Sequence, residues 1–139
     1  MENQEKYNNL SRLVEKLKKS DDPKRKYEYI LWLGKKLKEP DSKILIDKNK
    51  VNGCVSEVFV KASIKAGKLF WEGYSDALIT KGLLAFLISA LNDLTPNEVI
   101  EIDNKFIEDT GLKASLTPSR SNGFLNILLK MKSQANEFL

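Results

Sequence analysis

The first part of the chain has apolar side chains at helical spacing. Between residues 7 and 17 they lie three or four positions apart, at Tyr7, Leu10, Val14 and Leu17. This spacing places them on one face of an α-helix. A second helix is predicted to begin after Asp22, a capping residue, with Pro23 at its first position. Pro40 should end it. The sequence therefore predicts two amphipathic helices before residue 41.

The pattern changes to alternation after residue 57. Val58, Val60, Ala62 and Ile64 alternate with Phe59, Lys61 and Ser63, which is the two-residue period of a strand with one buried face. Ala66 and Gly67 fit a tight turn, and residues 68–74 return as a second strand. This segment is predicted to form an antiparallel hairpin.

The rest of the chain is predicted to be helical. A helix from Ala77 to about Leu94, with Ser75 as its cap, is apolar almost all round, so it should be buried in the middle of the domain. Residues 95–98 fit a capping box that starts a short helix. A second short helix is expected around residues 103–110, and Thr117 should cap the last helix.

The order of these elements predicts the fold class. Residues 41–54 form a connection that holds a short extended segment at most. Strands that are grouped, with helices before and after them, are typical of α+β folds. We expect one domain, residues 1–139, with helices packed on one face of a small antiparallel sheet of about three strands. Trp32 and Trp71 are predicted to lie in the core.

Composition removes several kinds of chemistry. The chain has no histidine and one cysteine, Cys54. Catalysis by Ser–His–Asp or Cys–His groups is therefore impossible within it, and a zinc site lacks ligands. An internal disulfide cannot form, which favours a reducing compartment. A free-standing hydrolase or transferase is disfavoured on the same grounds.

Charge is distributed unevenly along the chain. The net charge is +4, yet residues 1–50 hold 14 Lys and Arg against 9 Asp and Glu. A basic stretch at residues 16–26 could bind an acidic protein or nucleic acid, or it could be a solvated helix face. No apolar run is long enough to span a membrane. The first ten residues lack the layout of a secretory signal, so we expect a cytoplasmic protein.

Cys54 is the main candidate for reactivity. It follows Asn52 and Gly53, which favour a turn, so it should lie in a loop where another molecule can approach. A reactive thiol must be exposed and partly ionised, and Lys50 and Arg120 are the cations expected to lower its pKa. The alternative is a cysteine that only fills space in the core.

Three sequence blocks resemble the SufE family, the sulfur-acceptor partners of cysteine desulfurases. Residues 51–56 resemble the family's Val-Pro-Gly-Cys-Gln-Ser block. Residues 73–79, followed by Gly82, resemble its Gly-Asp-Ser-Asp-Ala-x-Ile…Gly block. Residues 116–123 resemble its Leu-Thr-Pro-Ser-Arg-x-Asn-Gly block. The blocks occur in the family's order and spacing, and the similarity covers about residues 23–135, including the helix around Trp32.

The resemblance implies a specific role. Cys54 would take persulfide sulfur from a PLP-dependent, SufS-type cysteine desulfurase, stimulate that enzyme and deliver the sulfur for iron–sulfur cluster assembly. The chain would have no turnover of its own and no cofactor or metal, because PLP belongs to the partner. Arg120 would stabilise the thiolate or the docking surface, and Asp76 would tether the cysteine loop. The alternative is that Arg120 and Asp76 have no functional role and are only residues at the starts of their helices.

The family resemblance carries further expectations and has three departures. The other partner would be a downstream iron–sulfur scaffold, and the protein would be a monomer or weak homodimer that binds neither nucleic acid nor membrane. Asn52, Val55 and Tyr74 replace the family's proline, glutamine and aspartate. These changes affect the loop and one polar contact, so the choice of desulfurase could differ.

Two other functions remain as alternatives. A U-type iron–sulfur scaffold has a similar fold, but a cluster is usually held by several thiolates, and this chain has one. A non-catalytic basic interaction module would use the N-terminal half to bind nucleic acid or an acidic protein. Its binding to nucleic acid should weaken steeply with salt.

Overall fold

The computed structural model describes residues 6–139. Residues 1–5, which belong to the segment considered above as a secretory signal, lie outside it. The elements in chain order are α2 (Asn8–Lys18), α3 (Pro23–Lys35), the 3-10 turns η1 (Ser42–Ile44) and η2 (Asp47–Asn49), β1 (Val58–Lys65), β2 (Lys68–Ser75), α4 (Leu78–Leu91), α5 (Pro96–Glu101), α6 (Phe106–Asp109), η3 (Leu112–Ser115) and α7 (Pro118–Asn136).

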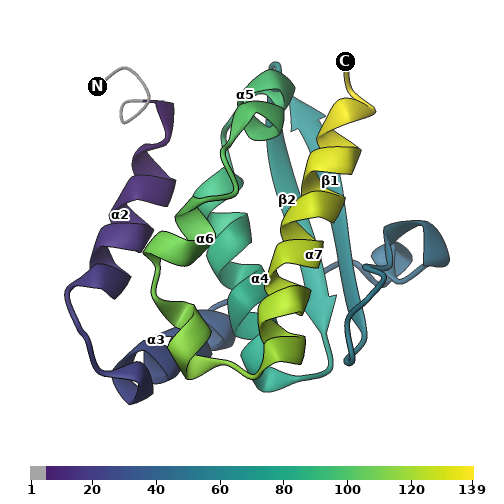
Figure 1. The fold of residues 1–139 in the computed structure, drawn as a ribbon. Helices are drawn as coiled ribbons and strands as arrows, with labels where there is room; N and C mark the ends of the chain where they lie inside the picture. Colours follow the sequence, from purple (N-terminus) through teal and green to yellow (C-terminus); the bar gives the residue numbers. More distant parts are fainter. Residues whose placement is uncertain (1–5) are drawn as a thin grey trace.

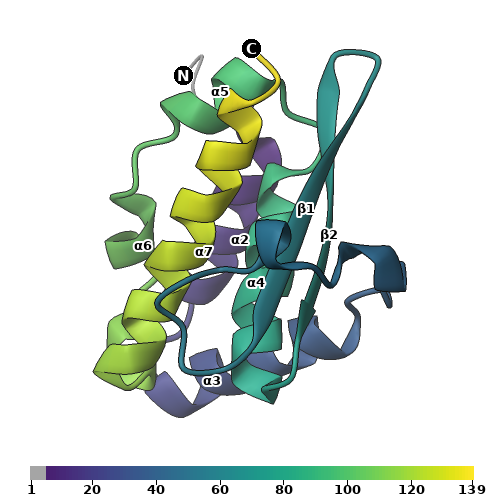
Figure 2. The ribbon, with the colours of Figure 1, turned by 90° about the vertical axis from the view of Figure 1, so that its right-hand side faces the viewer.

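The helices cover one face of the hairpin formed by β1 and β2. Helix α4 packs on β2 and α7 packs on β1, while α2 and α3 pack against the other side of α4 (Figure 1). Figure 2 shows the hairpin in front of α4, α7 beside α4, and α2 behind them. The predicted α+β fold with helices on one face of the sheet is confirmed. Within residues 6–139 no helix combines the length and apolar character needed to cross a membrane.

The hairpin has the predicted register. It pairs Val58 with Ser75 and ends at Lys65 and Lys68, so the turn residues are Ala66 and Gly67. Both turn residues have positive φ, 53° and 79°, as the right-handed twist of a two-residue hairpin requires. On β2 alternate side chains are buried, as the two-residue period predicts. On β1 the buried set includes Val58, Val60 and Ala62, but Phe59 is buried as well and Ile64 is exposed.

The sheet has two strands rather than about three. Beside the outer edge of β1, the connection folds into 3-10 turns and pairs through a single bridge, from Lys50 to Phe59. The side chain of Gln134 on α7 forms hydrogen bonds with this edge of β1. Its amide oxygen accepts from the Ala62 N–H at 2.8 Å, and its amide nitrogen donates to the Val60 carbonyl at 2.7 Å. A buried side chain thus satisfies backbone groups that a third strand would otherwise bind.

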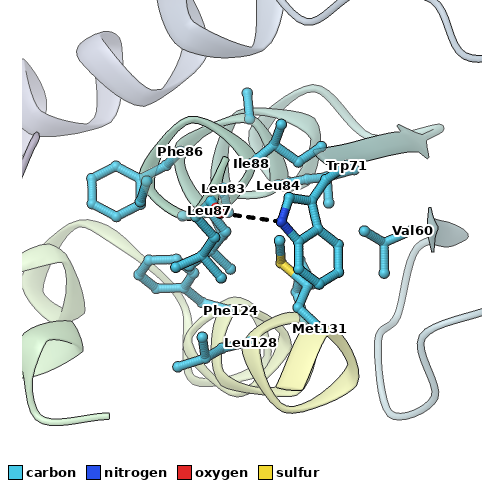
Figure 3. Close-up of a cluster of buried hydrophobic side chains, with 14 of the residues drawn as sticks. Val60, Trp71, Leu83, Leu84, Phe86, Leu87, Ile88, Phe124, Leu128 and Met131 are labelled. Atoms are coloured by element: carbon cyan, nitrogen blue, oxygen red, sulfur yellow. Dashed lines mark hydrogen bonds between the residues drawn. The ribbon is translucent and has the colours of Figure 1, made fainter. Parts of the chain in front are cut away.

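The core lies between the hairpin, α4 and α7. Figure 3 shows the side chains of α4 meeting Phe124 and Met131 of α7, with Trp71 and Val60 arriving from the strands. Phe86 and Phe124 meet edge to face, with ring centroids 5.7 Å apart. The indole N–H of Trp71 donates to the Leu91 carbonyl at 3.3 Å, so its one polar group is satisfied. The nearly all-apolar sequence of α4 follows from this central position.

Glycine lets α3 approach α4 closely. A Cβ on Gly82 would lie 2.2 Å from the Ile30 carbonyl oxygen, and one on Gly34 would lie 2.9 Å from the Gly82 nitrogen. No side chain fits at either position without separating the helices. This contact explains why each helix contains a glycine, whose conformational freedom is otherwise unfavourable in a helix.

Helix starts were predicted well, with one exception. Asp22 caps α3, Thr95 forms the capping box of α5, and Thr117 caps α7. Helix α4, however, begins at Leu78 after the cap residue Ala77, and it ends at Leu91. The predicted cap, Ser75, is instead the last residue of β2, because strand pairing with Val58 holds it extended.

Trp32 does not lie in the core. Its side chain is 47% exposed, whereas Trp71 is 6% exposed, as predicted. Trp32 stands on α3 beside Leu33, which faces α4 and is buried. The apolar character of tryptophan suggested burial, but the helical position turns it outward.

Candidate functional site

Cys54 lies in an irregular segment, residues 51–57, between η2 and β1. Figure 2 shows this segment, called here the cysteine segment, passing the N-terminal half of α7 before it enters β1. Gly53 has a φ of 82°, which is the left-handed region, and Asn52 and Gly53 form the predicted turn. The turn presents Cys54 toward α7 and the start of α4.

Hydrogen bonds fasten both ends of the cysteine segment. At its start, the Val51 N–H donates to the Val58 carbonyl at 2.8 Å. At its end, the Glu57 N–H donates to the Asp76 carboxylate at 3.0 Å, while the Asp76 N–H donates to the Glu57 carbonyl. The Asp76 side chain therefore bonds the cysteine segment and lies before the helix, not in its first turn.

Two side-chain contacts hold the middle of the segment. The Asn126 amide of α7 donates to the Gly53 carbonyl at 3.2 Å. This amide lies so close that a Cβ on Gly53 would be 2.6 Å from its nitrogen. On the other side of the thiol, the Ser56 hydroxyl donates to the Thr80 hydroxyl at 3.1 Å. Cys54 is thus flanked by one contact to α7 and one to α4.

The thiol itself is half-buried. Its Sγ points at α7 and donates a weak hydrogen bond to the Gly123 carbonyl at 3.8 Å. A Cβ on Gly123 would lie 3.5 Å from Sγ, so the glycine leaves the sulfur slightly more room. Burial raises the pKa of the Cys54 thiol above its ordinary value. In this arrangement the sulfur is mostly protonated at neutral pH.

A pocket of about 440 Å³ opens beside the sulfur. It is lined by Cys54, Val55, Ser56, Asp76, Ala77, Thr80, Thr117, Ser119, Arg120 and Gly123. The three residues singled out from the sequence thus share one pocket, although they come from the cysteine segment, the β2–α4 junction and α7. Arg120 is exposed in the first turn of α7, where its N–H donates to the capping hydroxyl of Thr117.

The expected effect of nearby cations on the thiol is wrong for this arrangement. Lys50 is not among the residues that line the pocket, because it pairs with Phe59 beside β1. Arg120 lines the pocket, but desolvation by burial is the cause that governs the thiol pKa. The pKa therefore shifts in the opposite direction to the prediction.

Two exposed apolar side chains beside the pocket were not predicted. Val55 is 91% exposed and Leu78 is 76% exposed, the highest values among the large apolar residues of the described chain. Val55 itself lines the pocket, and Leu78 follows the pocket-lining residue Ala77. The sequence gives a local signal for Leu78, because a leucine stands at the predicted start of a helix.

The sequence gives no local signal for Asn126, because its contact to Gly53 joins residues that are 73 positions apart.

The part of the chain that the structure describes contains no group of three or more Cys, Asp and Glu side chains positioned to hold a metal ion. The side chains that line the thiol pocket supply a thiol, a carboxylate, a guanidinium group and hydroxyls.

Comparison with protein families matches residues 11–135 to the model described as "SufE: Fe-S metabolism associated domain". The chain belongs to the SufE family. The predicted family is confirmed, and with it the association with iron–sulfur metabolism. The match spans the cysteine segment, the β2–α4 junction and the start of α7, which supply the pocket residues.

Relatives with SufE names are similar over nearly the whole chain. A SufE-like protein of Synechocystis is 49% identical over 130 residues, 94% of this chain and 82% of the relative. SufE-like protein 1 of Arabidopsis thaliana, named chloroplastic/mitochondrial, is 39% identical over 91% of this chain and 34% of the relative. The cysteine desulfuration protein SufE of Plasmodium falciparum is 33% identical, over 86% and 53%. The chain thus spans only a third to a half of the last two.

A solved structure supports the fold. The solution structure of a hypothetical protein from Thermus thermophilus matches with a TM-score of 0.80, covering 93% of this chain and 94% of that one, at 23% identity. The two chains share the arrangement of helices and hairpin.

Proposed function

We propose that this SufE-family chain is a sulfur acceptor and carrier. Cys54 receives persulfide sulfur from a PLP-dependent cysteine desulfurase of the SufS type, and the sulfur then passes to a scaffold for iron–sulfur cluster assembly. The observation that carries the proposal is the position of the chain's one thiol, half-exposed at the wall of a pocket. The family match and the name "cysteine desulfuration protein" of the Plasmodium relatives support it.

The transfer is an exchange between sulfur atoms. The Cys54 thiolate attacks the terminal sulfur of the desulfurase persulfide, forming a new S–S bond while the bond inside the donor persulfide breaks. The donor cysteine leaves as a thiolate, and the proton lost by Cys54 restores it to a thiol. Cys54 then carries the persulfide. Sulfur moves without net oxidation or reduction, and without a general base such as histidine.

Docking has to change the state of the thiol. In the free protein, burial raises the pKa of Cys54 and keeps the sulfur protonated, which slows both attack and oxidation. We infer that the desulfurase opens the pocket on docking, so that the thiol regains water and the thiolate becomes favourable. Taking sulfur off the desulfurase frees its cysteine for another turnover, which accounts for stimulation of that enzyme.

The neighbouring side chains have distinct roles in this proposal. Arg120 lies on the pocket wall and supplies a positive charge near the developing thiolate. Asp76 holds the cysteine segment through Glu57. Val55 and Leu78, both highly exposed, provide apolar contact for the docked desulfurase.

Further expectations belong to the same proposal. The chain acts as a non-enzymatic partner without turnover of its own, holds no resident cofactor or metal, and is a cytoplasmic monomer or weak homodimer of one domain. The departures Asn52 and Val55 lie on the exposed part of the cysteine segment, where they would influence which desulfurase is bound.

The test is to mix the protein with a SufS-type desulfurase, PLP and cysteine, and to weigh the intact chain without reductant. We expect the mass of one added sulfur atom on the wild type and none on Cys54→Ser. Arg120→Gln should slow the transfer while leaving fold and thermal stability unchanged. A wild-type chain that stays unmodified, or sulfur that persists on Cys54→Ser, contradicts the proposal.

A further inference from the structure

A second pocket, of about 570 Å³, lies between α2 and α3. It is lined by Arg12, Leu13, Glu15, Lys16, Lys19, Tyr29 and Trp32, and is called here the α2–α3 groove. None of these residues lines the thiol pocket. Figure 2 shows the cysteine segment in front of α7 and helix α2 behind it.

Helix α2 forms a basic wall of this groove. Arg12, Lys16 and Lys19 are four and three positions apart and exposed, so they form one stripe along the helix. Within the basic stretch of residues 16–26, three other residues have side-chain partners of their own: Lys18 is near Glu15, Arg25 is near Asp22, and Lys26 donates to the Thr110 carbonyl. Arg12, Lys16 and Lys19 are therefore the cations that line the groove.

Helix α3 forms an aromatic wall. Tyr29 stacks on Trp32, with ring centroids 5.7 Å apart and planes 24° from parallel. The ammonium group of Lys36 lies 3.8 Å from the centre of the indole ring. Trp32 remains 47% exposed although these contacts hold it in place. An ordered, partly exposed tryptophan offers apolar area at little entropic cost, which is the usual property of an anchoring residue at a protein interface.

We propose that the α2–α3 groove binds an acidic, amphipathic segment of a partner protein. An apolar side chain of the segment contacts Leu13 and the exposed part of Trp32, and its carboxylates pair with the basic stripe of α2. The stripe covers about 10 Å at the 1.5 Å rise of a helix, so roughly two turns of a bound helix fill it. The groove provides a second contact, separate from the thiol pocket.

The observations favour a protein segment over nucleic acid. Both the Tyr29 stack and the Lys36 contact use the faces of the indole ring, which are the surfaces on which a base would stack. Glu15 also lies in the lining, where it would repel a continuous phosphate backbone. A peptide can instead place its carboxylates opposite the cations alone.

The experiment selects peptides of about 12 residues, or three helical turns, from a random phage-displayed library on the immobilised full chain. Enriched peptides are synthesised and their affinities measured by fluorescence anisotropy at two salt concentrations. We expect acidic sequences with a large apolar residue, whose binding weakens with salt. Trp32→Ala and Lys16→Glu should each weaken it on the order of tenfold or more. Lys43→Glu, a charge change on exposed η1, is the matched control and should have no effect.

Three results would overturn the inference. The first is that the selection enriches neutral or basic peptides, or enriches no peptide at all. The second is that the enriched peptides bind the wild type, Trp32→Ala and Lys16→Glu with equal affinity. The third is tighter binding of a fluorescent oligouridine to the same residues, which would assign the groove to nucleic acid. Circular dichroism and melting curves establish that each variant is folded. Since no desulfurase is present, failure here leaves the proposed sulfur transfer intact, and the reverse also holds.

Discussion

The contact between Asn126 and Gly53 should control how often the thiol becomes exposed. It joins α7 to the turn immediately before Cys54, with the amide nitrogen 3.2 Å from the carbonyl oxygen. Asn126→Ala removes this hydrogen bond and leaves the other fastenings of the cysteine segment, at Val51, Ser56 and Glu57, in place. We therefore expect local opening of the segment to become easier while the rest of the fold stays unchanged.

The size of the effect follows from one hydrogen bond. An amide–carbonyl bond contributes about 0.5–1.5 kcal/mol net. When the whole loss falls on the closed form of the segment, the opening equilibrium shifts about two- to twelvefold, because about 1.4 kcal/mol corresponds to a factor of ten. A thiol that reacts only in the open form should be alkylated faster by the same factor.

The assay is the rate of iodoacetamide alkylation of Cys54 at neutral pH, followed by intact mass, beside urea unfolding of the same samples. Asn136→Ala is the control, since Asn136 is exposed near the end of the same helix. The acceleration should persist in low urea, which separates local opening from global unfolding. An unchanged rate in Asn126→Ala, or an equal acceleration in Asn136→Ala, would show that this contact does not govern thiol exposure.

Three further predictions concern pH and stability. Burial raises the pKa of Cys54 in the folded protein. The buried neutral thiol therefore contributes fully to the free energy of unfolding below the ordinary pKa of 9.0, and this contribution is lost as the pH rises through the pKa of the folded state. Urea titrations should show the wild type losing more stability than Cys54→Ser above pH 9; parallel pH profiles would refute this. Gln134→Leu should lower the unfolding free energy by about 2–5 kcal/mol, because two buried backbone groups lose their partners; a loss below 1 kcal/mol in urea would argue against that role. Gly82→Ala should destabilise by about 1–3 kcal/mol, since the new methyl overlaps Ile30. A melting temperature equal to the wild type would disprove this overlap.

Local chemistry alone determined much of this protein. The period of apolar residues predicted the hairpin and the helices, because each element must bury one face. Capping residues such as Asp22, Thr95 and Thr117 predicted helix starts, because their side chains bond N–H groups only two or three residues away. Three short motifs were enough to predict the family and the candidate site residue Cys54.

Only the tertiary structure decided the features that depend on contacts between distant segments. Gln134 replaces a third strand beside β1, and Asn126 holds Gly53, although neither residue stands out in the sequence. The pKa of Cys54 rises because packing against α7 removes water, an effect that counting nearby cations cannot predict. Hydrogen bonding along a helix or turn can be predicted from neighbouring residues. Burial and long-range pairing depend on how the whole chain packs.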